Sequence, residues 1–144
     1  LTAFAATITK GAGEDTDLWL RAALESPLVF SPRISARHNL DSSNRISHTP
    51  TKDRVFMSLD KYEAIAENNP YLKQYLDVNR FSFAIQHKLA KDDASFEDYV
   101  RKIDLKNLTS KQRFLLKQPR KALIGMKNLK YLLETLGKRT TAFK

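Results

Sequence analysis

Apolar residues recur three or four positions apart along most of the chain beyond residue 55, and polar residues fill the positions between them. This spacing is typical of a helix that buries one face, because about 3.6 residues complete a helical turn. It predicts successive helices over about residues 59–68, 70–90, 96–103, 110–118 and 119–136. In the longest of them the predicted buried stripe comprises Tyr71, Tyr75, Val78, Ile85 and Leu89, broadened by Leu72, Leu76 and Phe83.

The starts of the first three segments carry residues that favour helix initiation. Ser58 is predicted to cap the first helix and Asn69 the second, because their side-chain oxygens can accept hydrogen bonds from free backbone amides. Pro70 suits the first turn, where its missing N–H is not needed. Ser95 and Asp98 have the spacing of a capping box, which predicts the start of the third helix.

The last two segments have their own start and stop signals. Thr109 and Gln112 have capping-box spacing, and Pro119 is predicted to restart a helix after a break. Gly125 lies in the middle of that helix and costs about 1 kcal/mol relative to alanine, so we predict a kink or break there. Gly137 is the predicted C-terminal stop. The second half of this helix has one predicted leucine face, made of Leu129, Leu132, Leu133 and Leu136.

The first 54 residues follow a different pattern. The segment GEDTDLWLRAALES predicts one short helix at about residues 15–26, with Asp15, Thr16 and Asp17 at its N-terminal end, where they can cap free amides. Residues 31–51 are rich in Ser, Asn, Arg and Pro and show no helical or strand period. At about 20 residues this segment exceeds an ordinary loop, which predicts an extended arm that is disordered or ordered by a neighbour.

The predicted fold class is therefore all-α, a bundle of about five or six short-to-medium helices preceded by an extended, irregular N-terminal arm. No Asn-Gly or Asp-Gly hairpin signal occurs in the chain. The predicted domains are residues 1–54, the arm with one short helix, and residues 55–144, the helical domain, whose strongly basic part is 101–144. The first residue is Leu, which indicates a processed, trimmed or excised chain.

The net charge of +9 is unevenly distributed. Residues 101–144 contain 13 Lys or Arg and two acidic residues, whereas residues 1–100 contain 12 Lys or Arg and 14 acidic residues. All of the basic excess therefore lies in the last 44 residues. Such asymmetry is typical of a segment that faces a polyanion.

Within this part, residues 111–133 carry seven Lys or Arg and no acidic residue, with apolar residues between them. A solvated helix face usually alternates Glu with Lys four residues apart, because such pairs stabilise the helix. Their absence predicts that an external anion relieves the repulsion; a basic face that binds nothing is the alternative. The predicted polyanion-binding residues are Lys111, Arg113, Lys117, Arg120, Lys121, Lys127, Lys130, Lys138 and Arg139.

Nucleic acid, RNA ahead of DNA, is the expected polyanion, and another acidic surface is the alternative. A membrane surface is less favoured, because the apolar edge of the tract is mostly Leu rather than Trp or Phe. The tract has no zinc-finger spacing, aromatic RNA-binding motif or Gly-rich clamp, so binding should depend on the nucleic-acid backbone and not on base sequence. No run of 18 apolar residues occurs, so no membrane span is predicted.

No residue pattern points to catalysis, a cofactor or a metal. The chain has no cysteine, and the three histidines, His38, His48 and His87, lack ligands at metal-site spacing. Adjacent carboxylates such as Asp92 and Asp93 fall at predicted helix starts, where capping explains them. Nucleophile and phosphate-loop motifs are absent, and most aromatic residues fall at core-like helical spacing. The sequence therefore predicts a protein that is not an enzyme.

The leading functional hypothesis is a basic helical subunit of a large assembly, such as a ribonucleoprotein particle, an organellar complex or a virion. Its C-terminal helices would contact the polyanion, and its arm would contact neighbouring protein subunits. The predicted partner-binding residues are Trp19, Arg33, Arg37 and Arg45. An intracellular or organellar location is favoured over secretion, although no residue pattern decides the compartment.

The stretch LWLRAALESPLVF, followed at a distance by ENNPYLKQYL, resembles the Trp- and Tyr-containing helical module of secreted oomycete effectors. Leu18 stands where the first Arg of that family's Arg-x-Leu-Arg motif would be, and the accompanying acidic run is missing. The spacing between the two stretches is also longer than in the family, so no family is assigned. The resemblance implies the alternative hypothesis, a helical protein–protein interaction module such as a secreted effector or adaptor, with its partner face at Trp19 or at Tyr71, Tyr75 and Val78.

Overall fold

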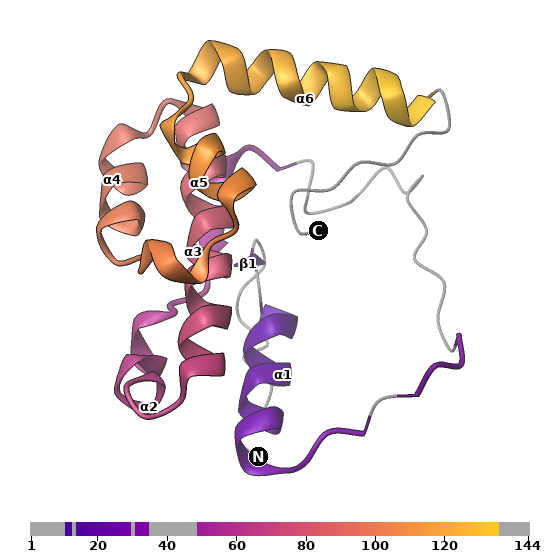
Figure 1. Ribbon diagram of the computed structural model, residues 1–144, viewed down its shortest axis with the longest axis vertical. Coiled ribbons are helices and arrows are strands. Elements are labelled where there is room, and N and C mark those ends of the chain that lie inside the picture. The colour runs from indigo at the N-terminus through magenta and orange to yellow at the C-terminus, as the bar shows by residue number, and fades with distance from the viewer. Residues whose placement is uncertain (1–10, 13, 30, 35–48, 136–144) are drawn as a thin grey trace. The chain divides into compact units, whose positions relative to one another are not determined.

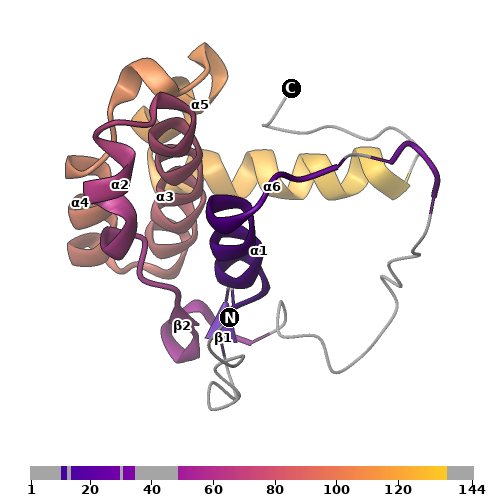
Figure 2. The same ribbon diagram turned by 90° about the horizontal axis from the view of Figure 1, so that it is seen from below.

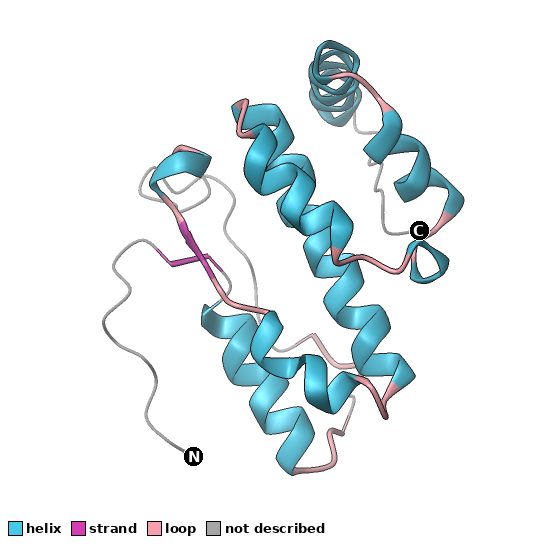
Figure 3. Cartoon of the chain, turned by 90° about the vertical axis from the view of Figure 1, so that its left-hand side faces the viewer, coloured by secondary structure: helices cyan, strands magenta, loops and turns pink. Residues whose placement is uncertain are grey.

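A computed structural model describes residues 11–12, 14–29, 31–34 and 49–135 of the chain (Figure 1). The chain divides into two compact units, Leu1–Met57 and Ser58–Lys144, and each is treated by itself. The described residues are mostly helical, with very little strand (Figure 3), which confirms the all-α prediction. The six α-helices in this part of the chain are α1 (Glu14–Glu25), α2 (Glu63–Ala66), α3 (Pro70–Ala90), α4 (Asp93–Arg101), α5 (Ser110–Lys117) and α6 (Arg120–Thr135).

The first unit contains α1, which matches the short helix predicted at about residues 15–26. A two-residue strand β1 (Gly11–Ala12) pairs in parallel with β2 (Val55–Phe56). This pairing joins the two ends of the unit and forms no hairpin, because the strands are parallel. A 3₁₀ turn, η2 (Thr51–Asp53), precedes β2. The remainder of the predicted arm, residues 35–48, lies outside the described residues.

The second unit is built around α3, its longest helix. The other helices of the unit, α2, α4, α5 and α6, all pack against α3, as does the 3₁₀ turn η4 (Leu105–Asn107). A second 3₁₀ turn, η3 (Asp60–Tyr62), leads into α2. The hydrophobic core lies where α3, α4 and α5 meet and contains Phe81, Ala84, Ile103, Leu108 and Leu116.

The predicted stripe of α3 is confirmed at Val78 and Ile85, which pack against the core, but in the first two turns the buried face differs from it by one residue. Leu72, Leu76 and Phe83, expected only to broaden the stripe, are buried, whereas Tyr71 is 83% exposed and Tyr75 is also exposed. Phe114 on α5, one of the aromatic residues at core-like helical spacing, is exposed as well. Neighbouring stripes of an amphipathic helix have the same period, so spacing alone does not decide which one the adjoining helices cover.

Two predicted helix starts are confirmed. The Asn69 side chain accepts a hydrogen bond from the amide of Leu72 at 3.0 Å, and Pro70 opens α3. Thr109 and Gln112 form a complete capping box at the start of α5, with the Gln112 amide donating to the Thr109 hydroxyl at 3.2 Å. Side-chain capping at these two points fixes where α3 and α5 begin.

Three other local predictions are wrong. Ser58 caps no helix, because the chain first forms η3, whose N-cap is Leu59. Ser95 lies inside α4, which starts earlier, with the carboxylate of Asp92 accepting from the Ser95 amide at 3.1 Å. The kink or break predicted at Gly125 is absent, since α6 runs as one straight helix from Arg120 to Thr135 (Figure 1). The position of the Cβ that Gly125 lacks is surrounded by open space, so no neighbour forces a bend there. The predicted stop at Gly137 lies beyond the described residues.

Candidate functional site

Two groups of charged side chains matter in the Ser58–Lys144 unit: one is gathered around carboxylates, and the other lies on a stretch of sequence that has no acidic residue. The first, the paired group, lies around the first half of α3. Arg80, which is almost fully buried, donates to Asp60 at 2.8 Å and to Glu63. Lys102 follows α4 and donates to Asp60 at 2.7 Å and to Asp98 at 2.9 Å. These cations are therefore neutralised within the unit.

Asp77 is the buried centre of the paired group and has no solvent exposure. Its carboxylate accepts hydrogen bonds from the Asn107 side-chain amide at 2.7 Å, from Lys73 Nζ at 3.1 Å and from the backbone amide of Asp104 at 3.3 Å. Arg80 Nη1 lies 3.6 Å from the same carboxylate. Asp77 thus ties α3 to the segment that follows α4.

These contacts shift the pKa values of the carboxylates. The hydrogen bond from Lys102 holds the pKa of Asp60 below its usual range, and the same side chain lowers the pKa of Asp98. Burial alone would raise the pKa of Glu63, but the hydrogen bond and charge of Arg80 outweigh it and the pKa is lowered. In return, the hydrogen bonds to Asp60 and Asp98 raise the pKa of Lys102.

Acidification is therefore expected to destabilise this unit. Because the folded-state pKa values of Asp60, Glu63 and Asp98 are lowered, the unfolded chain binds more protons below about pH 5. Their stabilising contribution is complete above that pH and is lost as the pH falls through the folded-state pKa values. Urea unfolding followed by circular dichroism at several pH values between about 3 and 7 measures this. Lys102→Met should make the free energy of unfolding less dependent on pH. An unchanged pH dependence in that variant would contradict the conclusion that Lys102 lowers the pKa values of Asp60 and Asp98.

The second group lies on α5 and α6 and contains most of the predicted polyanion-binding residues. Lys111, Arg113, Lys117, Lys121, Lys127 and Lys130 are all exposed. Within the part of the chain that the structure describes, Arg113, Lys117 and Lys121 make no salt bridge, and Arg113 donates only to the nearby Ser110 hydroxyl at 3.2 Å. Between residues 105 and 133 the sequence contains no acidic residue that could supply a partner.

Arg120 has a structural role that the sequence did not indicate. Its Nε donates to the backbone carbonyl of Leu89 at 2.9 Å, near the C-terminal end of α3. Lys88 makes a similar contact from α3 to the carbonyl of Leu116 at the end of α5, at 2.7 Å, and lies over the ring of Phe96. Both cations satisfy carbonyls at helix ends, where cations are favourable. Arg120 is therefore less available to an external anion than the exposed lysines.

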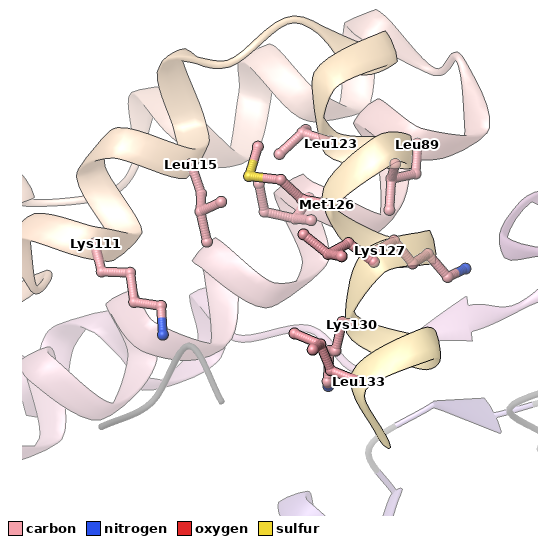
Figure 4. Close-up of a pocket in the computed structure, with 10 residues that line it drawn as sticks. Leu89, Lys111, Leu115, Leu123, Met126, Lys127, Lys130 and Leu133 are labelled. Carbon is pink, nitrogen blue, oxygen red and sulfur yellow. The ribbon is translucent and has the colours of Figure 1, made fainter. Parts of the chain in front are cut away.

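An apolar groove lies between α3, α5 and α6, with a cavity volume of about 410 Å³. Figure 4 shows Leu115, Leu123 and Met126 gathered at its centre. Lys111 lies on the α5 side, and Lys127 and Lys130 lie on the α6 side. The remaining lining residues are Ile85, Leu89, Leu129 and Leu133. Every titratable side chain that lines the groove is a lysine.

Helix α6 has apolar side chains that the other described helices do not cover. It begins over α3 and α5, and its C-terminal half extends beyond them (Figures 1 and 2). Leu129 is 54% exposed and Leu132 is 58% exposed, and Tyr131 is exposed between them. The periodicity predicts a packed leucine face that contains Leu129 and Leu132, and the structure corrects this.

The structure brings together three of the predicted polyanion-binding residues, Lys111, Lys127 and Lys130, around the groove. Arg113, Lys117 and Lys121 do not line it. Lys138 and Arg139 lie outside the described residues, as do Arg37 and Arg45 of the arm. In the first unit, Trp19 on α1 is 65% exposed and Arg33 is exposed. The groove itself was missed, although the spacing of Leu123, Met126 and Leu133 on one face of α6 was a signal for it.

Groups suited to other chemistry are scarce among the described residues. No group of three or more His, Asp or Glu side chains in this part of the chain is placed to hold a metal ion. His87 Nδ1 lies 2.9 Å from the carboxylate of Asp92, the residue that caps α4. Within the same residues, no helix is long and apolar enough to cross a membrane.

No protein-family model matches the chain, and comparisons with curated proteins and with solved structures find no match.

Proposed function

We propose that this chain is a non-enzymatic, basic helical subunit of a larger assembly that binds nucleic acid, or another polyanion, through α5 and α6. Its N-terminal arm contacts neighbouring proteins. The observation that carries the proposal is the contrast in ion pairing within one unit. Lys73, Arg80 and Lys102 each have carboxylate partners, whereas Arg113, Lys117 and Lys121 have none among the described residues.

Cations without carboxylate partners raise the free energy of the free protein, because like charges within a few residues repel each other. Contact with phosphates relieves this repulsion and releases condensed counterions, which drives binding. The exposed basic side chains on these two helices are mainly Lys, with one Arg, and no stacking motif accompanies them, so the contacts would be to the backbone of the nucleic acid. Single-stranded or structured RNA of any sequence is the expected ligand.

Fluorescence anisotropy of the full chain with a labelled, unstructured 20-nucleotide RNA tests this proposal. For three to five phosphate contacts, affinity should fall roughly 20- to 130-fold between about 50 and 200 mM salt, because each contact contributes about 0.7 to the slope for a single strand. Polyglutamate is the control: equal affinity for it would indicate an acidic protein surface. Undetectable binding at low salt, or binding that salt does not weaken, would overturn the proposal.

A second candidate function is the helical protein–protein interaction module, and a specific observation favours it. Tyr71 and Tyr75 lie on the exposed face of α3, and Ile65 on α2 is also exposed. Tyrosines are enriched at protein interfaces because they combine a large apolar ring with a polar group. A chain with this function would show no salt-dependent RNA affinity.

A further inference from the structure

The groove between α3, α5 and α6 has the form of a helix-binding site. Its floor and walls are formed by side chains of Ile85 and Leu89 from α3, Leu115 from α5, and Leu123 and Met126 from α6. The lining residues of α6 run from Leu123 to Leu133, so at about 1.5 Å per residue they give a wall about 15 Å long. About three turns of a partner helix would lie along this wall.

The groove is open, and the residues that the structure describes fill it incompletely. Leu129 lines it and yet is 54% exposed, and Leu133 at its far end is only partly buried. Apolar grooves of this kind bind an amphipathic helix, whose residues at positions i, i+3, i+4 and i+7 enter the groove.

The charges around the groove select among possible occupants. Lys111 stands on one side, and Lys127 and Lys130 stand on the other, with no carboxylate among the lining residues. A helix that enters between them has a cation on each flank, so acidic residues beside its apolar stripe would complement both sides. A second copy of α6 would instead bring lysines against lysines, which disfavours self-association through this helix.

We propose that this groove docks an amphipathic α-helix of another protein, one whose apolar stripe is flanked by Asp or Glu. This site is separate from the polyanion contact, because nucleic acid has no apolar stripe to fill the groove. The two sites adjoin on α6, and Lys127 and Lys130 belong to the groove, whereas Lys121 does not line it.

Three designed 16-residue peptides test the proposal by fluorescence anisotropy with the full chain at about 150 mM salt, where surface charges more than about 8 Å apart are largely screened. The first has a Leu stripe flanked by Glu, the second has Lys in place of Glu, and the third has the first peptide's composition with the Leu residues distributed around the helix. The first should bind at least about tenfold more tightly than either of the others, because only it satisfies both the apolar floor and the basic rim.

A pair of variants on α6 locates the binding. Leu129→Gln should weaken binding of the first peptide about tenfold or more, since it removes a leucine that the peptide would bury. Leu132→Gln is the matched control: Leu132 has nearly the same exposure, 58%, but does not line the groove. Because both leucines are largely exposed, both variants should fold, which circular dichroism verifies.

Equal effects of the two variants, or equal binding of the three peptides, would overturn the proposal. Sedimentation analysis of the protein alone tests a second copy as the occupant: a dimer that Leu129→Gln dissociates would show that another molecule of this chain fills the groove, and would also overturn the proposal. RNA binding should be unchanged in Leu129→Gln, so the failure of this proposal and the failure of the polyanion proposal are distinguishable.

Discussion

Replacing Asp77 with alanine is expected to destabilise the Ser58–Lys144 unit by about 3–5 kcal/mol, the range found when one partner of a buried ion pair is removed. Asp77 has no solvent exposure, and Arg80 beside it is almost as deeply buried. Without the carboxylate, Lys73 and Asn107 each lose a hydrogen-bond acceptor. A buried donor without an acceptor costs more than the bond itself contributes.

Urea unfolding followed by circular dichroism measures this effect, and two further variants interpret it. Asp98→Ala removes an exposed carboxylate from the same group of ion pairs and should have a much smaller effect, because exposed pairs contribute little. The double variant Asp77→Leu, Arg80→Met removes both buried charges and should recover part of the loss. If Asp77→Ala destabilised the chain no more than Asp98→Ala, Asp77 would not be the buried centre of the unit.

The helices could be predicted from the sequence where a capping side chain fixes the start. Asn69 with Pro70, and Thr109 with Gln112, make hydrogen bonds within one turn, so the residues that decide the structure are adjacent in the sequence. The predicted start at Ser95 was wrong because Asp92 stands three residues earlier and also has an oxygen that can cap. When two possible N-cap residues lie so close together, their spacing alone does not show which of them starts the helix.

The tertiary arrangement could not be predicted in the same way. Which stripe of α3 is buried depends on where α2, α4 and α5 pack, and Tyr71 and Leu72 are equally acceptable to the periodicity. The same holds for Arg120, which looks like its basic neighbours in the sequence but donates to Leu89, 31 residues earlier. The groove likewise exists only because three helices converge.

The basic composition of the site, by contrast, could be predicted, because it depends on which residues are missing. The absence of acidic residues from 105 to 133 is a property of the sequence, and it deprives Lys117 and Lys121 of nearby partners. The sequence alone could not separate the cations that line the groove from those that face elsewhere. This separation now permits variants that remove one set and leave the other.

The triple variant Arg113→Gln, Lys117→Gln, Lys121→Gln is expected to weaken RNA binding about 100-fold at about 100 mM salt, if each side chain neutralises one phosphate. The salt dependence should also fall, by about 0.7 in the log–log slope for each phosphate of a single strand that is no longer neutralised. These residues are exposed and make no salt bridge within the described part of the chain, so the variant should unfold at nearly the same urea concentration as the parent protein.

The matched control is Lys61→Gln, Lys91→Gln, Arg101→Gln, which removes the charge of two lysines and one arginine from exposed positions before α5. Its net charge equals that of the first variant, so a general electrostatic attraction would weaken both alike. If RNA instead binds at a surface on α5 and α6, only the first variant should lose RNA affinity. Equal losses of affinity in the two variants would mean that RNA senses the total charge of the chain, and the localised surface would be wrong. The control should instead retain affinity within about threefold, because charges beyond a Debye length of about 10 Å are largely screened at this salt concentration.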